Sequence, residues 1–484
     1  MKHIVIHPDD TVAVALNPLA EGETIGGIDI RESIPAGHKF ALRNLAQGEA
    51  VIKYASPIGY ASSPIKAGQH VHVHNLHTTL SGLNQYTYEP ALPQKTADEP
   101  GAFMGYRRDD GRVGIRNEIW IIPTVGCINP SVRAIARATR VYPGIDGVYA
   151  LEHPYGCSQL GNDHEMTREI LMRLCRHPNA GGVLIVGLGC ENNRLGALVE
   201  LLGDFDPRRL RYFNSQEVDD EIEYGLKEVE ALAAVMKDDR RQLCSTADLV
   251  VGLKCGGSDG FSGITANPLL GRFANQLVSQ GGAAVMTEVP EMFGAEMPLM
   301  NRCVSEDIFN DAAAMINGFK SYFLRYDQEI YENPSPGNKD GGITTLEEKS
   351  LGCTQKGGQA AVEGIIPYGG AIRSKGLHLL NGPGNDLVAV TALAAAGCQL
   401  ILFTTGRGTP LGSPVPVVKV STNSALAQMK SAWIDFDAGR ILNDSPGLDS
   451  EFYAHILRIC EGTLTASEKM NARDISILRD GVTL

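Results

Sequence analysis

Alternating strand-like and helix-like segments are the feature that most limits how this chain can fold. Short runs rich in apolar and β-branched residues occur at 119–125, 147–151, 183–188, 249–253 and 400–403. Amphipathic helical patterns lie between them, for example Glu165 to Arg176 and Val218 to Met236. This alternation predicts largely parallel sheets whose faces are covered by helices.

The N-terminal part follows a different pattern. Short alternating runs are separated by Pro, Gly and Asp turns over residues 1–90, which predicts a small all-β domain. Residues 91–104 are rich in proline and charge and lack periodicity, as in a linker. We expect two α/β regions after it, at 105–243 and 244–484, because 484 residues exceed what one core usually serves.

The net charge and the pattern of cysteines indicate what kind of ligand the protein binds and in which cellular compartment it is found. A formal charge of -13 argues against nucleic acid or an anionic membrane as the main partner and favours a small soluble ligand. The N-terminus has no apolar signal region, and ten cysteines without paired spacing predict a reduced, cytoplasmic protein. The apolar run 387–403 is expected to form a helix, a turn and a buried strand rather than a membrane span.

Four cysteines stand at the ends of predicted strands: Cys127, Cys157, Cys190 and Cys255. Each lies beside glycine, and the carboxyl ends of parallel strands form the ligand-binding edge of open α/β sheets. Two interpretations stay open. The cysteines are either small apolar side chains that pack in the interior, or they form a thiolate-rich site for iron or zinc. No C-x-x-C pair is present among the four, so a metal there would be assembled from distant segments.

A histidine-rich segment, GQHVHVHNLH, covers residues 68–77. His70, His72 and His74 alternate with valines, so they would project from one face of a strand. Three imidazoles on one face can bind a metal, although a solvated polar face is the other interpretation.

Three glycine-rich loops carry further polar candidates. The loop 255–268 offers Ser258 and Asp259 after Cys255. The segment 332–342 is too rich in Gly, Pro and Asn for regular structure and carries Asn338 and Lys339, while 404–410 surrounds Arg407 with glycine and threonine. Each loop is also consistent with a tight turn or a linker.

Nine motifs in this order resemble those of the altronate and galactarate dehydratase family: GHKFAL, GQHVHVHN, HPYGCSQLG, GLGCENN, CGGSDGFSGITANP, TEVPEMFGAE, ENPSPGNK, GCTQKGG and TTGRGTP. The resemblance implies an N-terminal β-clip domain of the SAF type followed by two α/β regions. It also implies Fe2+, or Mn2+ in some members, as activator. HVHVHN and GCTQKGG are features of the altronate branch.

The resemblance implies a hydro-lyase that converts D-altronate to 2-dehydro-3-deoxy-D-gluconate in hexuronate (galacturonate) catabolism, acting as a homo-oligomer on a small sugar acid. The C2 proton beside a carboxylate is barely acidic, so a cation must stabilise the developing enediolate and a base must remove the proton. Alternatives are another sugar acid such as galactarate, an iron-sulfur hydro-lyase, or a non-catalytic sugar-acid sensor.

Site residues follow as hypotheses. His72 and His74 are expected as metal ligands or acid/base groups, with His153 as a second candidate base. The metal site would also include Cys157, Cys190 and Cys255. Carboxylate and hydroxyl groups of the substrate would be held by Ser258, Asp259, Asn338, Lys339 and Arg407.

Overall fold

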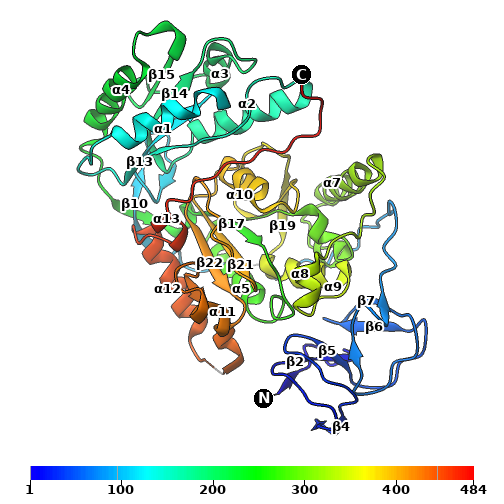
Figure 1. The fold of residues 1–484 in the computed structure, drawn as a ribbon. Helices are drawn as coiled ribbons and strands as arrows, with labels where there is room; N and C mark the ends of the chain where they lie inside the picture. The colour runs from blue at the N-terminus through cyan, green and yellow to red at the C-terminus, as the bar shows by residue number, and fades with distance from the viewer. Residues whose placement is uncertain (1, 95, 444) are drawn as a thin grey trace.

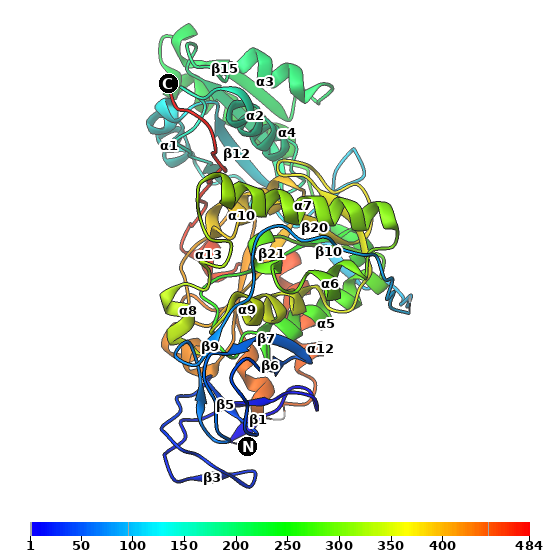
Figure 2. The ribbon, with the colours of Figure 1, turned by 90° about the vertical axis from the view of Figure 1, so that its right-hand side faces the viewer.

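The computed structural model describes residues 2–94, 96–443 and 445–484. The chain forms three regions, and the third lies between the first and the second (Figures 1 and 2). The fold class expected from the sequence is confirmed, because a small antiparallel domain is followed by two α/β regions with parallel sheets. No helix in the described part of the chain is long and apolar enough to cross a membrane.

The N-terminal domain is built from short antiparallel strands. Its sheets have the orders β1-β2-β5-β8 and β6-β7-β9, and β3 pairs with β4. The strands are β1 (His3–Ile4), β2 (Val12–Ala15), β3 (Thr24–Ile25), β4 (Ile28–Asp29), β5 (Lys39–Ala41), β6 (Ala50–Lys53), β7 (Ser56–Ala61), β8 (His70–Val71) and β9 (Leu76–His77). The strand predicted through the histidines is shorter than expected, because β8 ends at Val71 and a turn carries His72 and His74.

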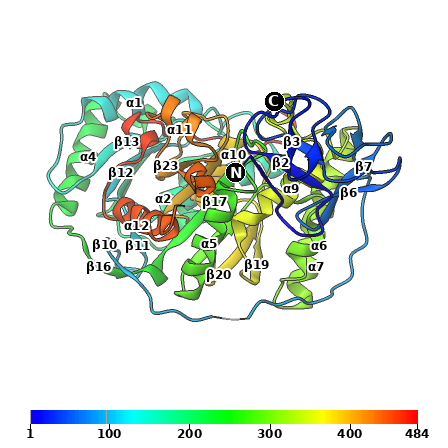
Figure 3. The same cartoon turned by 90° about the horizontal axis from the view of Figure 1, so that it is seen from below.

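The segment between β9 and the second region runs along the third region (Figure 3). It is held there by hydrogen bonds, from Tyr88 Oη to the carbonyl of Cys303 (2.6 Å) and from Ala91 N to the carbonyl of Asn301 (2.8 Å). Within the predicted linker 91–104 a strand already begins, β10 (Ala102–Arg107). It pairs antiparallel with β11 (Val113–Gly114) and β16 (Gln242–Ser245).

The second region has a four-stranded parallel sheet of order β13-β12-β14-β15. Its elements are β12 (Glu118–Pro123), η1 (Gly126–Ile128), α1 (Asn129–Ala138), β13 (Gly147–Ala150), α2 (Gly161–Cys175), β14 (Ala180–Gly187), α3 (Leu195–Leu202), β15 (Leu210–Asn214), η2 (Ser215–Glu217) and α4 (Glu221–Met236). Side chains alternate along β12: Ile119 and Ile121 face α1 and α4, while Trp120 and Ile122 face α2 and α3. Both faces of the strand are therefore buried, as its continuous apolar run predicts.

The third region has a seven-stranded parallel sheet of order β19-β20-β18-β17-β21-β22-β23. Its strands are β17 (Val250–Cys255), β18 (Ala283–Met286), β19 (Val362–Ile366), β20 (Gly376–Leu380), β21 (Leu400–Thr405), β22 (Val417–Ser421) and β23 (Phe436–Asp437). From β17 the chain adds strands on one side and later returns to add β21 on the other. Open α/β sheets bind ligands at the carboxyl ends of such a reversal point, and the loop 255–268 leaves β17 there.

Helices cover both faces of this sheet, with α5 on one side and α10 on the other. The remaining elements are η3 (Thr246–Asp248), α5 (Ala266–Ser279), η4 (Val289–Met292), α6 (Glu296–Met300), α7 (Glu306–Arg325), α8 (Pro336–Asp340), α9 (Leu346–Cys353), η5 (Thr354–Gly357), α10 (Asp386–Ala395), α11 (Ser424–Met429), η6 (Ala438–Asn443), α12 (Leu448–Cys460) and α13 (Ala466–Lys469). The helix and strand expected within residues 387–403 are confirmed as α10 and β21.

One segment differs from the sequence prediction. Residues 332–342 were expected to lack regular structure, but they contain α8. Ser335 and Asn338 form a reciprocal capping box around the first turn, and Pro336 occupies its start. This local capping stabilises a short helix in a segment whose composition disfavours one.

The second and third regions share a hydrophobic core. One cluster of buried side chains includes Leu171 and Ile185 from the second region and Ile401 from the third. The C-terminal tail adds Ile475 and Ile477 to the same cluster, runs between α10 and α2, and ends near α2 (Figure 1).

Candidate active site

The N-terminal domain docks on the carboxyl edge of the third sheet, and helix α9 lies at the junction. The contact is close, because a Cβ added to Gly260 would lie 2.0 Å from the carbonyl oxygen of Gly37. All eight residues of α9 are buried, including Glu347, Glu348 and Lys349. Buried charges are costly unless they are paired, so their partners show what this junction is built to hold.

Glu348 binds two lysines of the N-terminal domain. Its carboxylate oxygens lie 2.9 Å from Lys39 Nζ and 2.8 Å from Lys53 Nζ, and all three side chains are buried. Burial opposes ionisation of Glu348, but the two ammonium groups outweigh it and hold the pKa of the carboxyl well below its usual range. Because two ammonium groups face one carboxylate, the three side chains together carry a net positive charge.

A second buried group combines two thiols with a carboxylate. Cys255, at the end of β17, and Cys353, at the end of α9, have their Sγ atoms 3.3 Å apart. Glu291 Oε2 in η4 lies 3.0 Å from Cys255 Sγ and 3.2 Å from Cys353 Sγ. These three are the one set of three or more His, Cys, Asp or Glu residues in the described chain whose ligand atoms all lie within 4.8 Å of one another.

Lysines surround this thiol centre, which we define as Cys255, Glu291 and Cys353. Lys356 Nζ lies 2.7 Å from Cys255 Sγ, and Lys349 Nζ lies 2.8 Å from Glu291 Oε1. Burial opposes the charge of Lys356, but the neighbouring sulfur and carboxylates raise its pKa well above the usual value. Lys356 therefore remains an ammonium ion and provides a fixed positive charge.

Glu288 completes the surroundings of the centre. Its carboxylate pairs with Lys254 and Lys356 and accepts the backbone N–H of Cys255 at 3.0 Å. The residue has a left-handed φ of +74°, which is uncommon for a side chain other than glycine or asparagine. Backbone strain of this kind persists where surrounding contacts hold it, and it gathers at functional sites.

The charges around the thiol centre match a divalent cation. Three ammonium groups and three carboxylates balance when both thiols are protonated: Lys254, Lys349, Lys356, Glu288, Glu291 and Asp386. Ionising both thiols adds two negative charges, which one divalent ion offsets. Two metal–ligand bonds of about 2.0–2.3 Å span the 3.0–3.3 Å between the ligand atoms. The residues therefore fit a divalent metal ion.

The histidines gather on the N-terminal domain against α8. His38 Nδ1 and His70 Nε2 lie 3.0 Å apart. His38 Nε2 is 3.2 Å from the carbonyl of Asp340, and His72 Nε2 is 3.0 Å from the carbonyl of Lys339. Because a carbonyl only accepts, Nε2 of His72 carries the proton and its Nδ1 is a free acceptor.

Protonation of this histidine group is disfavoured. Burial is the main cause, and it lowers the pKa of His70 to about 3 and that of His72 to about 4. His74 is exposed and its ring is tilted against that of His70. At neutral pH, His70 and His72 are therefore uncharged.

The five predicted substrate-binding residues lie on the third region near this junction, but they differ in their contacts. Ser258 is buried, and its carbonyl accepts from Asn338 Nδ2 at 2.8 Å. The carboxylate of Asp259 already binds protein groups, because it accepts hydrogen bonds from Thr422 Oγ1 (2.9 Å) and from other donors. Arg407 is exposed beside Gly257.

The predicted residues of the second region lie elsewhere. Cys157 and Cys190 are exposed at the carboxyl edge of the second sheet, whereas Cys255 is buried in the third. His153 is buried beside Cys157, with Nε2 2.8 Å from the carbonyl of Pro123 and Nδ1 accepting from Tyr155 N. The structure therefore does not bring Cys157 and Cys190 to Cys255 within one chain, because their strands belong to different sheets.

Sequence reasoning missed several groups at the junction. Cys353 and Lys356 were noted only as part of a loop motif, and Glu291 lies in TEVPEMFGAE without a role assigned. The signals were present, since Lys254 interrupts an otherwise apolar strand and Glu291 stands among apolar residues. Their partners are remote in the sequence, so pattern alone could not pair them.

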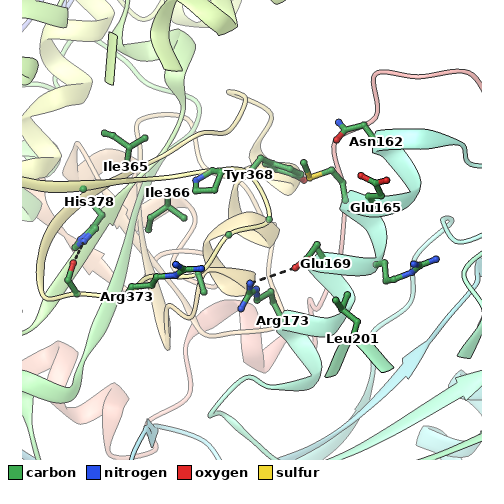
Figure 4. Close-up of a pocket in the computed structure, with 18 residues that line it drawn as sticks. Asn162, Glu165, Glu169, Arg173, Leu201, Ile365, Ile366, Tyr368, Arg373 and His378 are labelled. Carbon is green, nitrogen blue, oxygen red and sulfur yellow. Dashed lines mark hydrogen bonds and ion pairs between the residues drawn. The ribbon is translucent and has the colours of Figure 1, made fainter. Parts of the chain in front are cut away.

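A pocket of about 790 Å³ lies between α2 and the β19–β20 segment. Figure 4 shows Arg173 paired with Glu169 on one wall, and Arg373 on the other. None of the predicted site residues lines it. A much smaller pocket, of about 10 Å³, lies beside the thiol centre and has room for about one water molecule. It is lined by Lys53, Ser258, Glu348, Lys349, Cys353 and neighbouring residues.

Comparison with known proteins gives consistent matches along the chain. Family models match residues 1–79 (altronate/galactarate dehydratase SAF domain), 105–237 (D-galactarate dehydratase/altronate hydrolase, second domain) and 246–483 (D-galactarate/altronate dehydratase, C-terminal). Altronate dehydratase of Escherichia coli (strain K12) is 51% identical, covering 100% of both chains, and that of Bacillus subtilis (strain 168) is 48% identical, covering 99% of each. Galactarate dehydratase (L-threo-forming) of Escherichia coli (strain K12) is 31% identical over 95% of this chain and 93% of its own.

Proposed function

Because the chain belongs to the altronate and galactarate dehydratase family, we propose that it is a hydro-lyase that converts D-altronate to 2-dehydro-3-deoxy-D-gluconate. Two relatives named altronate dehydratase share about half of its residues over the full chain, whereas the galactarate dehydratase shares 31%. This difference supports D-altronate over galactarate as the substrate.

The observation that carries the proposal is the buried positive charge beside the small pocket. Lys39 and Lys53 share a single carboxylate, and the pocket is lined by Lys53 and Lys349. An anionic substrate would compensate this charge, since ion pairs are strong where water is excluded. Ser258 lines the same pocket and can hydrogen-bond a sugar hydroxyl, and because the pocket holds about 10 Å³, the proposal requires it to widen when the sugar acid binds.

The chemistry requires loss of a proton from C2 and of the hydroxyl group from C3. The two electrons left at C2 form the enol double bond as the hydroxyl leaves with a proton as water, and the enol then tautomerises to the 2-keto acid. Negative charge develops on the carboxylate oxygens during this step. Lys356 stays protonated beside the thiol centre and can stabilise that charge from a fixed position.

We propose that Cys255, Glu291 and Cys353 hold the divalent ion that the family uses, with Fe2+ favoured over Mn2+ by the sulfur ligands. Such an ion would supply Lewis-acid charge next to the reacting carbons. Lys349 orients Glu291 through its 2.8 Å ion pair, and Glu288 holds Lys356 beside Cys255.

His72 is the best-supported base among the predicted residues. Its imidazole is neutral, because burial keeps its pKa at about 4, and its Nδ1 is free to accept a proton. Asn338 is next to the residue whose carbonyl binds His72, and its side chain donates a hydrogen bond to the carbonyl of Ser258 in the small pocket. Asn338 therefore connects the histidines with the proposed substrate pocket. Lys339 and Arg407 are retained as groups that attract the substrate carboxylate.

Replacing His72 and His74 together by asparagine is expected to lower kcat for D-altronate by about 10²- to 10⁴-fold, the usual contribution of general acid–base groups. The measurement is initial velocity under anaerobic conditions with added Fe2+. His77→Asn is the matched control, because His77 is exposed on the same domain. Full activity of the double variant would reject the assignment.

A substrate panel tests the proposed reaction itself. We expect the purified chain, supplied anaerobically with Fe2+, to form a 2-keto-3-deoxy acid from D-altronate at a kcat/KM at least tenfold above that for galactarate or other aldonates. Product is measured colourimetrically and identified by mass spectrometry. Turnover of galactarate at the higher rate would overturn the assignment, and binding of D-altronate without product would indicate a sensor.

A further inference from the structure

Three cysteines in the second region take no part in the proposed reaction. Cys127, Cys157 and Cys190 follow β12, β13 and β14, which are neighbours in the second sheet. Parallel strands end at one edge, so the three residues meet there. All three are exposed, whereas the other seven cysteines of the chain are buried.

Hydrogen bonds join the three loops that carry these cysteines. Gly126 N donates to the carbonyl of Tyr155 at 2.8 Å, which ties the loop of Cys127 to that of Cys157. Asn193 N donates to the carbonyl of Gly156 at 3.0 Å, which ties the loop of Cys157 to that of Cys190. The cysteines are therefore presented on one connected surface.

Each of the three cysteines is preceded by glycine, and the structure requires glycine at all three positions. Gly189 has φ of +125°, a conformation that L side chains rarely adopt. Gly156 has φ of +101°, and a Cβ there would lie 2.1 Å from the carbonyl oxygen of Thr124. A Cβ on Gly126 would lie 2.8 Å from the carbonyl oxygen of His153. These glycines allow the loops to approach closely and bring the thiols to the same edge.

The turn that carries Cys190 is held by a buried carboxylate. Glu191 accepts the backbone N–H groups of Leu188 at 3.1 Å and Gly189 at 2.7 Å. Glu191 is only 3% exposed, so it is a structural acceptor and leaves Cys190 as the outward-facing group of the turn.

The surroundings of the three thiols favour an anion. Helices α1, α2 and α3 begin two, four and five residues after Cys127, Cys157 and Cys190, and none has a side-chain cap. The fourth helix of the region, α4, is capped by Asp220. Uncapped helix N-termini leave free N–H groups and a partial positive charge next to the thiols.

We propose that Cys127, Cys157 and Cys190 hold a cubane [4Fe-4S] cluster through three of its irons, with the fourth iron open to solvent. One ion cannot bind all three thiols in the observed arrangement, because two metal–sulfur bonds of about 2.3 Å span at most about 4.6 Å. Among the described residues, the three sulfurs do not form a group with all separations within 4.8 Å. A cubane binds each thiolate through a different iron and therefore accepts a wider spacing.

Assembly is balanced as binding of two ferrous ions, two ferric ions and four sulfides, which together form a [4Fe-4S] core of charge 2+ without electron transfer, and each thiol loses one proton as its sulfur–iron bond forms. The cluster with three thiolates is anionic, so the partial positive charge of the helix N-termini would stabilise it. The site is separate from the thiol centre at Cys255, since that centre takes one ion and no sulfide.

The test is anaerobic reconstitution of the full chain with equal amounts of ferrous and ferric iron and with sulfide, followed by assay of iron and acid-labile sulfide. We expect about four sulfides per chain in the parent. Cys127→Ser, Cys157→Ser and Cys190→Ser should each lose most of this sulfide, and the visible charge-transfer absorbance with it. Cys353→Ser is the matched control and should keep its sulfide, because it alters only the thiol centre.

Two outcomes would overturn the proposal: a reconstituted parent that binds iron without labile sulfide, or a triple variant that keeps parental sulfide. Thermal denaturation of the metal-free proteins checks folding, which exposed Cys→Ser changes should leave within a few degrees. A second readout needs no variant. Alkylation followed by mass spectrometry should label Cys127, Cys157 and Cys190 in the metal-free parent and spare them after reconstitution, and equal labelling would reject the site.

Discussion

Replacing Glu291 by glutamine is expected to lower kcat for D-altronate by about 10²- to 10³-fold or more, the effect of losing one charge-stabilising group in an active site. Glu291 contacts both thiols and pairs with Lys349, so the carboxamide would remove a metal ligand and a fixed charge together. Bound iron of the anaerobically loaded protein should fall in parallel. Steady-state kinetics and iron analysis of the same samples measure both effects.

Glu296→Gln is the matched control for this change. Glu296 is also buried and pairs with one lysine, Lys320, at 2.8 Å, but it does not contact the thiol centre. Both substitutions leave a buried ammonium without its carboxylate and should cost about 3–5 kcal/mol of stability. Only Glu291→Gln should lose iron and turnover. Parental kcat and iron content in Glu291→Gln would remove Glu291 from the proposed site.

Replacing Glu348 by glutamine is expected to lower the free energy of unfolding by at least about 3–5 kcal/mol. The substitution leaves two buried ammonium groups, Lys39 and Lys53, facing each other without a carboxylate. Because both lysines belong to the N-terminal domain, the change should also loosen its docking. Urea denaturation measures the first effect, and protease cleavage in residues 80–94 under native conditions measures the second.

Glu49→Gln is the control, since Glu49 forms an exposed pair with Arg43 and should change the free energy of unfolding far less than Glu348→Gln does. The effect of Glu348→Gln should depend on pH. The folded-state pKa of Glu348 is lowered, so its contribution is fully present above the unfolded pKa of about 4.3 and is lost as pH falls below that value. The difference between parent and variant should therefore shrink in acid. A difference that is constant down to pH 3 would contradict the assignment.

The parallel strands could be predicted because their signal is local. The apolar runs at 119–125, 147–151 and 183–188 form β12, β13 and β14. A strand buried on both faces must be apolar throughout, which holds for β12 and β14, whereas β13 is an edge strand of intermediate burial. Helix α8 was missed, because its stability comes from a capping box rather than from composition.

The ion pairs of the site could not be predicted, because their partners are far apart in the sequence. Lys39 and Glu348 are separated by 309 residues, and neither has a neighbour that indicates pairing. Cys255 was predicted at a site with Cys157 and Cys190, since all three follow strands. Which sheet a strand joins is decided by its long-range packing, and the structure places Cys255 with Cys353 and leaves the other two beside Cys127.

The core shared by the second and third regions also determines when the second region can finish folding. Ile475 and Ile477 pack in the same cluster as Leu171 and Ile185, and Asp163 on α2 accepts the backbone N–H groups of the tail residues Asp480 and Gly481 at 2.9 Å. These tail residues follow the third region in the chain, so they are synthesised after it. Residues 105–237 therefore match a family model of their own but complete their core only after the third region and residues 475–481 have been synthesised. In evolutionary terms, the second and third regions must be inherited together, because each supplies part of the other's interior.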